Sequence, residues 1–400
     1  ITAGTWAQVK ADNDVTVNGD VTATGESVYV NAGYDATTDG TLTANTWAKV
    51  QAMHDITTND ITTTKGNIVV SSTGTGDNAG TVTLKGVLDA GVQKYATAVS
   101  VGTNGKFINA TDQTKAAINV ADGSHWKIYS NNPVDDEFGT NLNSGNAAQW
   151  NHAYTGSTDG YNGRQDAANR YVSAVQPSVE FNTDKATNIY GETLEPAAVK
   201  TVNVYAGHDL TEYKAFDETL EPSYTGTATV SSKGYEAGAT RTDGNQTAKD
   251  GNNAIYTATV DISKVQGQRG YAVAAKNSTV EVLRRDLQIQ SDSSLTYGDA
   301  AVTTKNTITG SLVNNDTVDE AGLQQKYGVA ASSAYEKNRQ KRTTADADTY
   351  QKDAAYKVGI KNGHKDASAN YNITLSGDVT VNQADLTLTN YDMTYVYGTK

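Results

Sequence analysis

The chain has 400 residues, a net charge of −13 and no cysteine. The missing cysteine excludes disulfides, thiol chemistry and every cysteine-ligated metal site. The negative charge argues against nucleic acid as a partner, because phosphates are repelled unless a concentrated basic face attracts them. Threonine, valine and tyrosine favour strands, while asparagine, aspartate and glycine favour turns, so the composition predicts an all-β fold.

A 41-residue repeat begins the chain. Residues 5–9 (TWAQV) recur as residues 46–50 (TWAKV), and residues 14–16 (DVT) recur as residues 55–57 (DIT) at the same offset of 41. Within each block, strands of three or four residues alternate apolar with polar positions and are separated by Asn, Asp or Gly. Three such strands in a coil of about 20 residues, stacked on the next coil, bury a continuous apolar column. The sequence therefore predicts a right-handed parallel β-helix of about six coils over residues 1–122.

Residues 123–177 lack this repeat, and we expect them to form a cap or junction. An open last coil would expose unpaired backbone groups and apolar side chains, so a solenoid needs a closing segment. The segment holds two of the four tryptophans and two of the four prolines. The residues expected to build it are Trp126, Tyr129, Pro133 and Trp150.

A second repeat, of 100 residues, occupies the rest of the chain. Tyr-Gly dipeptides recur there, and Tyr271 and Tyr371 each precede one of them by 26 residues. We expect two small β-sandwich-like domains, at residues 178–284 and 285–384, with a third repeat starting at residues 385–400. The fixed position of the dipeptides favours a structural role for their tyrosines over a carbohydrate-stacking role. The dipeptides consist of Tyr190, Gly191, Tyr297, Gly298, Tyr397 and Gly398.

Two shorter features lie in the second of these domains. A helix is expected around residues 318–327, with Asp316 or Thr317 as its N-terminal cap. Residues 337–342 (KNRQKR) form the only dense basic run of the sequence. We interpret it as a solvated loop, with contact to an acidic glycan or a membrane surface as the alternative.

The cap segment resembles a known family. Residues 126–133 (WKIYSNNP), followed by Asp135, Asp136 and residues 169–172 (NRYV), resemble the junction of filamentous-haemagglutinin-type adhesins. In that family a β-helix gives way to tandem domains at this junction. The Tyr-Gly units resemble the MBG (YGX-type) repeats that commonly follow it.

The resemblance covers essentially the whole chain and implies a large Gram-negative surface protein exported by two-partner secretion. It implies an outer-membrane transporter as export partner, and host or bacterial cell-surface glycans or proteins, with neighbouring copies, as binding partners. The family's amino-terminal secretion domain is not among these 400 residues, so the export route rests on the resemblance. The resemblance carries no catalytic residues.

No residue pattern supports catalysis, and we predict that the chain is not an enzyme. Cleavage of glycosides needs paired carboxylates, for which Asp14 with Asp20 and Asp55 with Asp60 are the candidates. Aspartate at a corner usually makes its own turn, and the acidic run at 135–137 is interpreted as an exposed loop. The histidines show no metal-ligand spacing; they are His54, His125, His152, His208 and His364.

The sequence leaves open two further possibilities, calcium binding and N-glycosylation. Asp-Asn and Asp-Gly corners offer oxygen ligands, but the sequence has neither an EF-hand loop nor the glycine-rich calcium-binding nonapeptide. Asp77-Asn78 and Asp243-Gly244 are therefore interpreted as turns. Sequons for N-glycosylation stand at Asn109, Asn245, Asn277, Asn315 and Asn372.

These observations together predict a non-catalytic stalk or shaft segment of a large secreted adhesin or extracellular filament, acting in adhesion, aggregation or biofilm at the bacterial surface. A secreted β-helix that binds or cleaves polysaccharide is the first alternative. The stalk of a contact-dependent toxin is the second.

Overall fold

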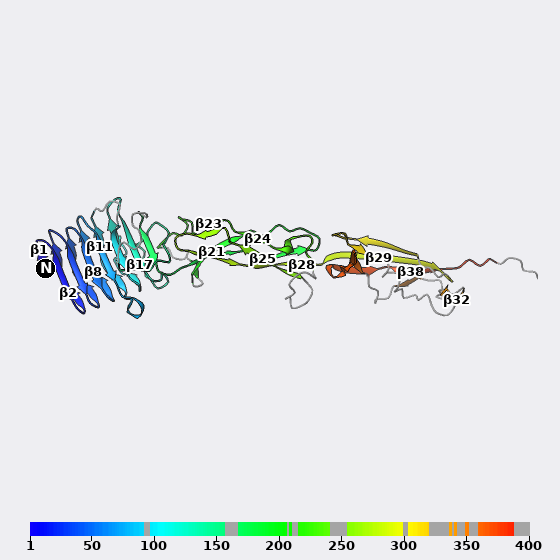
Figure 1. Ribbon diagram of the computed structural model, residues 1–400, viewed down its shortest axis with the longest axis horizontal. Helices are drawn as coiled ribbons and strands as arrows, with labels where there is room; N and C mark the ends of the chain where they lie inside the picture. Colours follow the sequence, from blue (N-terminus) through cyan, green and yellow to red (C-terminus); the bar gives the residue numbers. More distant parts are fainter. Residues whose placement is uncertain are drawn as a thin grey trace, which may run out of the picture. The chain divides into compact units, whose positions relative to one another are not determined.

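The computed structural model describes residues 1–91, 97–156, 167–205, 208–209, 215–240, 254–298, 303–319, 336–337, 340–341, 349–351 and 359–387 (Figure 1). Strands make up nearly all of the regular structure in these ranges, which confirms the expected all-β class. The helical elements there are short 3-10 turns, none of them long or apolar enough to cross a membrane. They are η1 (Gly76–Asn78), η3 (Lys233–Tyr235) and η4 (Ser368–Asn370).

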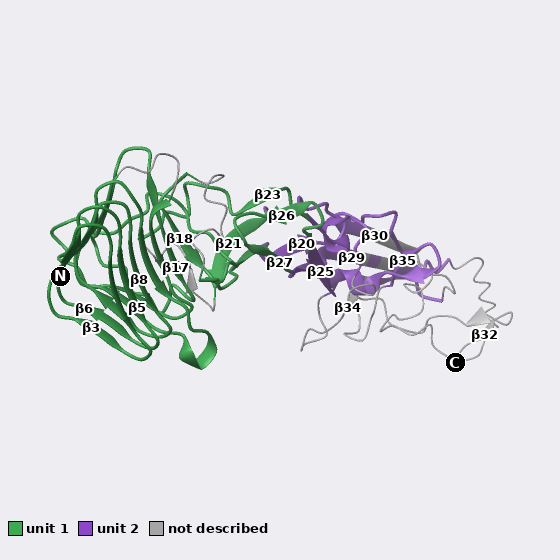
Figure 2. Ribbon diagram, turned by 60° about the vertical axis from the view of Figure 1, so that its left-hand side comes forward, with its two compact units in different colours: residues 1–182, 199–229, 260–276 green, residues 183–198, 230–259, 277–400 purple. Residues whose placement is uncertain are grey.

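Two compact units divide the chain, and Figure 2 colours them separately. Unit 1 comprises residues 1–182, 199–229 and 260–276. Unit 2 comprises residues 183–198, 230–259 and 277–400. Each unit is described by its own sheets below.

Unit 1 begins with three parallel sheets that the chain visits in a fixed cycle (Figure 1). One passage through all three sheets is called a coil. Sheet 1 contains β1 (Thr2–Ala3), β4 (Val21–Ala23), β7 (Leu42–Ala44), β10 (Ile61–Thr63), β13 (Leu88–Ala90) and β16 (Ile118–Val120). Sheet 2 contains β2 (Ala7–Ala11), β5 (Val28–Ala32), β8 (Ala48–Ala52), β11 (Ile68–Ser72), β14 (Thr97–Gly102), β17 (His125–Ser130) and β18 (Arg170–Ser173). Sheet 3 contains β3 (Val15–Val17), β6 (Ala36–Thr38), β9 (Ile56–Thr58), β12 (Val82–Leu84) and β15 (Phe107–Asn109).

Apolar columns hold successive coils together. The three-residue strands of the coils bury their first and third side chains, as the Val-Thr-Ala strand β4 does; in β16 the third side chain is half-buried. Ile61 pairs in register with Leu42 on one side and Leu88 on the other, and all three are fully buried. Burial of one such side chain stabilises the fold by about 1.5–3 kcal/mol. The period-2 pattern of the sequence therefore determines which side chains enter the core.

Aspartates at the corners bond the backbone of the following coil. Asp14 Oδ1 accepts from Asp35 N at 3.2 Å, and Asp35 Oδ1 accepts from Asp55 N at 2.9 Å. Asp55 Oδ1 accepts in turn from Thr81 N at 2.7 Å. We call this series the corner aspartate ladder. A second corner repeats the arrangement, with Asp20 accepting from Thr41 N at 2.8 Å and Asp60 from Val87 N at 2.7 Å.

Sheet 2 extends beyond residue 122, where the β-helix was expected to end. Strand β17 pairs in parallel with β14, and β18 pairs in parallel with β17. Single bridges also join Glu137 to Ile108 and Gln149 to Val172. The expected boundary therefore falls inside the stack. The chain leaves sheet 2 after β17 and returns to it at β18, and no local sequence pattern encodes the pairing of these two strands.

Beyond residue 177 the sheets mix parallel and antiparallel pairs. Sheet 4 contains β22 (His208–Asp209), β21 (Lys200–Tyr205), β19 (Ser178–Asn182) and β27 (Ala272–Lys276); sheet 5 contains β20 (Ala186–Ile189), β28 (Ser278–Leu283), β25 (Ala254–Asp261) and β24 (Thr229–Ser231). Sheet 6 pairs β23 (Tyr224–Gly226) with β26 (Val265–Gly267). Sheet 7 contains β30 (Thr303–Thr309), β29 (Arg285–Thr296), β38 (Asp378–Asn382), β34 (Thr349–Gln351) and β37 (Tyr371–Ser376). Sheet 8 contains β31 (Thr317–Val318), β35 (Ile360–Asn362) and β36 (Lys365–Asp366), and sheet 9 pairs β32 (Glu336–Lys337) with β33 (Gln340–Lys341).

The compact units do not coincide with the domains expected at residues 178–284 and 285–384. No strand pairing in the described ranges joins those two segments, in agreement with the 100-residue repeat. One hydrophobic cluster nevertheless contains Tyr190 and Tyr256 from the first segment together with Leu287 and Tyr371 from the second. The expected separate cores are thus merged, because repeats this thin bury their apolar faces against their neighbours.

The helix expected around residues 318–327 is absent where the structure describes that segment. Thr317 and Val318 form β31, which pairs antiparallel with β35. Asp316 is not a helix cap, because its carboxylate accepts hydrogen bonds from two tyrosine hydroxyls in the core. Residues 320–327 lie outside the described ranges, as do Asn245, Tyr397 and Gly398.

Candidate functional site

A groove lies on the outer face of sheet 2. Its volume is about 680 Å³. Aromatic and polar side chains line it together, the combination typical of ligand sites. The lining residues are Trp6, Gln8, Glu26, Ser27, Tyr29, Thr46 and Trp47.

The 41-residue repeat positions the two tryptophans. Each tryptophan precedes a buried alanine, Ala7 in β2 or Ala48 in β8, and side chains alternate faces along a strand. Both indole rings therefore point outward, and 52% of Trp6 and 38% of Trp47 are exposed. Strand β5 lies between β2 and β8, so the tryptophans stand two strand spacings apart, roughly 9.6 Å.

Tyr29 of the middle strand completes the groove, with Ser27 just before β5 and Thr46 just before β8. The Tyr29 ring meets the Trp47 ring edge to face, with centroids 4.9 Å apart. The Ser27 and Thr46 hydroxyls share a hydrogen bond of 2.7 Å. Flat aromatic faces suit the C–H faces of sugar rings, and the polar side chains suit sugar hydroxyls. Glu26 is the single carboxylate of the lining, whereas glycoside hydrolysis requires a pair of carboxylates.

The carboxylates proposed as catalytic pairs serve the backbone. Asp14, Asp20, Asp55 and Asp60 each accept a backbone N–H of the following coil. These hydrogen bonds favour the interpretation of the four aspartates as corner residues over their interpretation as acid–base catalytic pairs. None of the four lines the groove.

Two aspartates of the ladder, together with a neighbouring histidine, could offer metal ligands. One ligand atom from each of Asp35, His54 and Asp55 lies within 4.8 Å of the others. His54 Nδ1 lies 3.0 Å from Asp35 Oδ1 and 3.6 Å from Asp55 Oδ1. Both carboxylates already accept backbone N–H groups, and calcium takes six to eight oxygens. The sequence analysis did not find this cluster, because Asp35 comes from the coil before His54 and Asp55. The signal that finds it is the offset of one coil between the two aspartates.

Asp136 is buried more deeply than the expected exposed loop at 135–137 would allow. Its Oδ2 accepts the Ser130 hydroxyl at 2.5 Å, and its Oδ1 accepts Phe107 N at 2.8 Å. Burial raises the pKa of Asp136 to about 7 against the hydrogen bonds from Ser130 and Phe107, which lower it. Glu137 beside it is exposed and pairs with Lys106 at 2.6 Å.

The raised pKa of Asp136 predicts that unit 1 loses stability as the pH rises from about 4 to about 8. Between its usual pKa and about 7 the folded chain binds the proton and the unfolded chain does not, so folding is favoured at the acidic end. Urea unfolding at pH 5 and pH 8, followed by tryptophan fluorescence, measures the effect. The Asp136→Asn variant should show a smaller loss, whereas an equal loss in both proteins would contradict the assignment.

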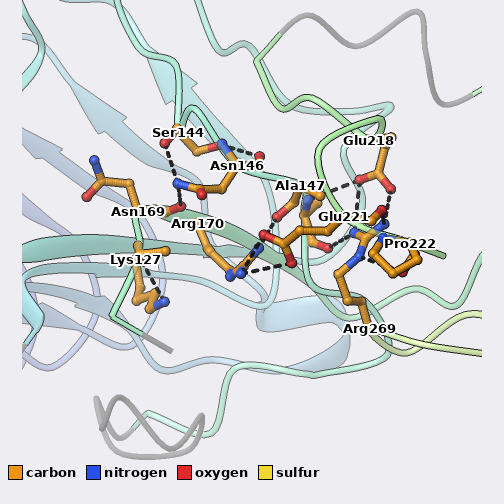
Figure 3. Close-up of polar contacts among 12 residues, drawn as sticks. Lys127, Ser144, Asn146, Ala147, Asn169, Arg170, Glu218, Glu221, Pro222 and Arg269 are labelled. Carbon is orange, nitrogen blue, oxygen red and sulfur yellow. Dashed lines mark hydrogen bonds and ion pairs between the residues drawn. The ribbon is translucent and has the colours of Figure 1, made fainter. Parts of the chain in front are cut away.

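Buried ion pairs fix the segments that follow the stack (Figure 3). Arg170 of β18 donates to Ala147 O at 2.6 Å and pairs with Glu221 at 2.8 Å. Arg269 donates to Ala148 O at 2.5 Å and pairs with Glu218 at 2.8 Å, where 9% and 2% of the two side chains are exposed. These pairs serve the packing of unit 1.

The expected cap residues are all buried in unit 1. Trp126 and Tyr129 lie in β17, where Trp126 packs against Tyr171 at 5.3 Å and Tyr129 against Tyr154 at 5.4 Å. Pro133 is buried in the turn after β17, and Trp150 packs edge to face against Phe216.

The described sequons differ in accessibility. Asn109 is buried, and its amide donates to Phe138 O and Asn141 Oδ1, so the folded chain does not offer it for glycosylation. Asn277, Asn315 and Asn372 are exposed. The Asn372 amide donates to Asp286 at 3.0 Å.

The two described Tyr-Gly dipeptides are in unlike surroundings. Tyr190 is 2% exposed in the core of unit 2, whereas Tyr297 is 48% exposed. Gly191 and Gly298 share a left-handed φ, +87° and +86°.

Sequence reasoning identified the Thr-Trp-Ala repeat but did not propose its tryptophans as a site. The available signal was a large aromatic residue one position before an inward-facing alanine, repeated two coils later.

No family model matches this chain, and neither the curated proteins nor the solved structures contain a match to it.

Proposed function

We propose that the chain is a non-catalytic stalk segment of a secreted bacterial surface adhesin and that the groove on sheet 2 makes weak contacts with glycans. In this proposal the coils from residue 1 to strand β18 form a right-handed parallel β-helix, and small β-sandwich-like repeats follow it. The observation that carries it is the pair of outward tryptophans, Trp6 and Trp47, held in register because β2 and β8 both pair with β5. Stacked coils supply reach, and repeated weak contacts supply avidity.

The charge of the chain narrows the class of glycan. The net charge is −13, and the groove contains Glu26 but no lysine or arginine. Acidic polysaccharides are repelled by such a surface, whereas neutral or amino-sugar chains are not. The spacing of the tryptophans suits an extended oligosaccharide that contacts both rings.

The glycan proposal predicts that Trp47→Ala weakens binding of a neutral or amino-sugar oligosaccharide at least about tenfold, or 1.4 kcal/mol. The reason is that Trp47 supplies a stacking face and also positions Tyr29. Titration of the full chain against a panel of neutral, amino-sugar and sulfated oligosaccharides, followed by isothermal calorimetry, measures the affinities.

Met53→Ala is the matched control, because Met53 is an exposed apolar residue of the same coil, 39% exposed, outside the groove. It should bind like the parent chain. Failure of the parent chain to bind any oligosaccharide of the panel would overturn the glycan contact. Release of shorter sugars from the panel would instead favour a polysaccharide-cleaving protein.

A further inference from the structure

The two 100-residue repeats use the same arrangement of a tyrosine and a carboxylate. In unit 1 the Tyr271 hydroxyl donates to Glu218 at 2.6 Å. In unit 2 the Tyr371 hydroxyl donates to Asp316 at 2.8 Å. The tyrosines are 100 residues apart and the carboxylates 98, so the arrangement belongs to the repeat.

Each arrangement also holds an aromatic residue that precedes the repeat. The Tyr271 ring packs edge to face against Trp150 at 6.0 Å, and Glu218 accepts the backbone N–H of Ala148 at 3.0 Å. The Tyr371 ring packs edge to face against Tyr190 at 5.5 Å, and Asp316 accepts the Tyr190 hydroxyl at 2.9 Å. The carboxylate and tyrosine of a repeat thus bind the structure that comes before it.

The second repeat covers the Tyr190–Gly191 dipeptide. Tyr190 is 2% exposed, and a Cβ on Gly191 would lie 2.2 Å from Val313 Cγ2. Val313 N in turn donates to the Tyr371 hydroxyl at 3.1 Å. Val313, Asp316 and Tyr371 therefore form one contact surface for this dipeptide.

Tyr297–Gly298 has the same backbone geometry, but its tyrosine is far more exposed than Tyr190. Tyr190 N donates to Leu283 O at 3.0 Å after the parallel pair β20–β28, and Tyr297 N donates to Asn382 O at 2.9 Å after the parallel pair β29–β38. Tyr297 is nevertheless 48% exposed. A Cβ on Gly298 would meet no atom of the described residues within 4 Å.

We propose that Tyr297–Gly298 is the docking surface for a third repeat of this chain's own kind, which would supply its counterparts of Val313, Asp316 and Tyr371. A second copy of the chain is a poor occupant, because its Asp316 and Tyr371 are already bonded to its own Tyr190. The sequence predicts the start of a third repeat in residues 385–400, where Tyr397 and Gly398 continue the spacing. The inference goes beyond the proposed function, since it concerns how repeats join and needs no glycan.

The test lengthens the full chain by adding a copy of residues 299–398 after Gly398. Hydrogen exchange with mass spectrometry then follows the amides around Tyr297 in the parent and extended chains. The expected result is at least about tenfold slower exchange in the extended chain, because docking suppresses local opening of the end of β29. Tyr297→Ala, or Asp316→Ala in the added copy alone, should abolish the slowing.

Ile308→Ala is the matched control, because Ile308 is an exposed apolar residue of the same repeat, 39% exposed, away from the dipeptide. It should leave the slowing intact. Exchange around Tyr297 that is unchanged by the extension would overturn the proposal. So would an added repeat whose own amides stay unprotected, since docking is what allows a following repeat to fold.

Discussion

Glu218→Gln is expected to lower the free energy of unfolding of unit 1 by about 3–5 kcal/mol, the cost of breaking a buried ion pair by removing one charge. The Glu218 carboxylate is 2% exposed and accepts from Arg269 at 2.8 Å, Tyr271 at 2.6 Å and Ala148 N at 3.0 Å. Glutamine keeps the size but presents an amide NH2 to these donors. The Arg269 guanidinium then stays buried without a counter-charge.

Tryptophan fluorescence during urea unfolding measures this loss selectively, because Trp6, Trp47, Trp126 and Trp150 all belong to unit 1. Glu137→Gln is the control. Glu137 pairs with Lys106 at 2.6 Å, but its side chain is 62% exposed, and a pair at the surface contributes about 0–1 kcal/mol. Equal losses of unfolding free energy in the two variants would show that burial does not make the Glu218 pair more stabilising than the exposed Glu137 pair.

Gly66→Ala is expected to destabilise unit 1 by about 3 kcal/mol, the upper part of the range for overpacking. A Cβ on Gly66 would lie 1.0 Å from Thr46 O and 3.0 Å from Trp47 N, both on the neighbouring coil. Neighbouring strands are about 4.8 Å apart, so the coils must separate at this corner. Because Thr46 and Trp47 line the groove, the proposed glycan binding should weaken together with stability.

Gly19→Ala is the matched control for this corner. Gly19 also follows a short strand, but no atom of the described residues lies within 4 Å of a Cβ placed there. The urea midpoint of this variant should stay close to that of the parent chain. If both variants unfold at the parent midpoint, the coils are not packed as closely as the structure places them.

The sequence predicted the coils because their determinants are local. Alternating side chains and corner residues recur every coil, so the burial of Val15 and Val17 with Thr16 outside could be read directly. The return of the chain to sheet 2 at β18 could not, because residues 131–169 contain no repeat that pairs Arg170 with Lys127.

The candidate site was predictable only in part. The alternation places Trp6 and Trp47 on the outer face, but the groove also needs Tyr29 from the strand between them, whose position follows from the stacking register.

The partners of Asp316 lie 126 and 55 residues away, at Tyr190 and Tyr371. A local capping rule assigned Asp316 to a helix because it could not include such distant partners.

The corner aspartate ladder has a direction. The carboxylates of Asp14, Asp35 and Asp55 each accept an N–H of the coil that follows in sequence. A finished coil therefore presents acceptors already aimed at the coil that has not yet formed. Each folded coil can therefore help the next coil to fold, in the direction of synthesis. Folding can then proceed coil by coil in a chain whose N-terminus arrives first at its destination.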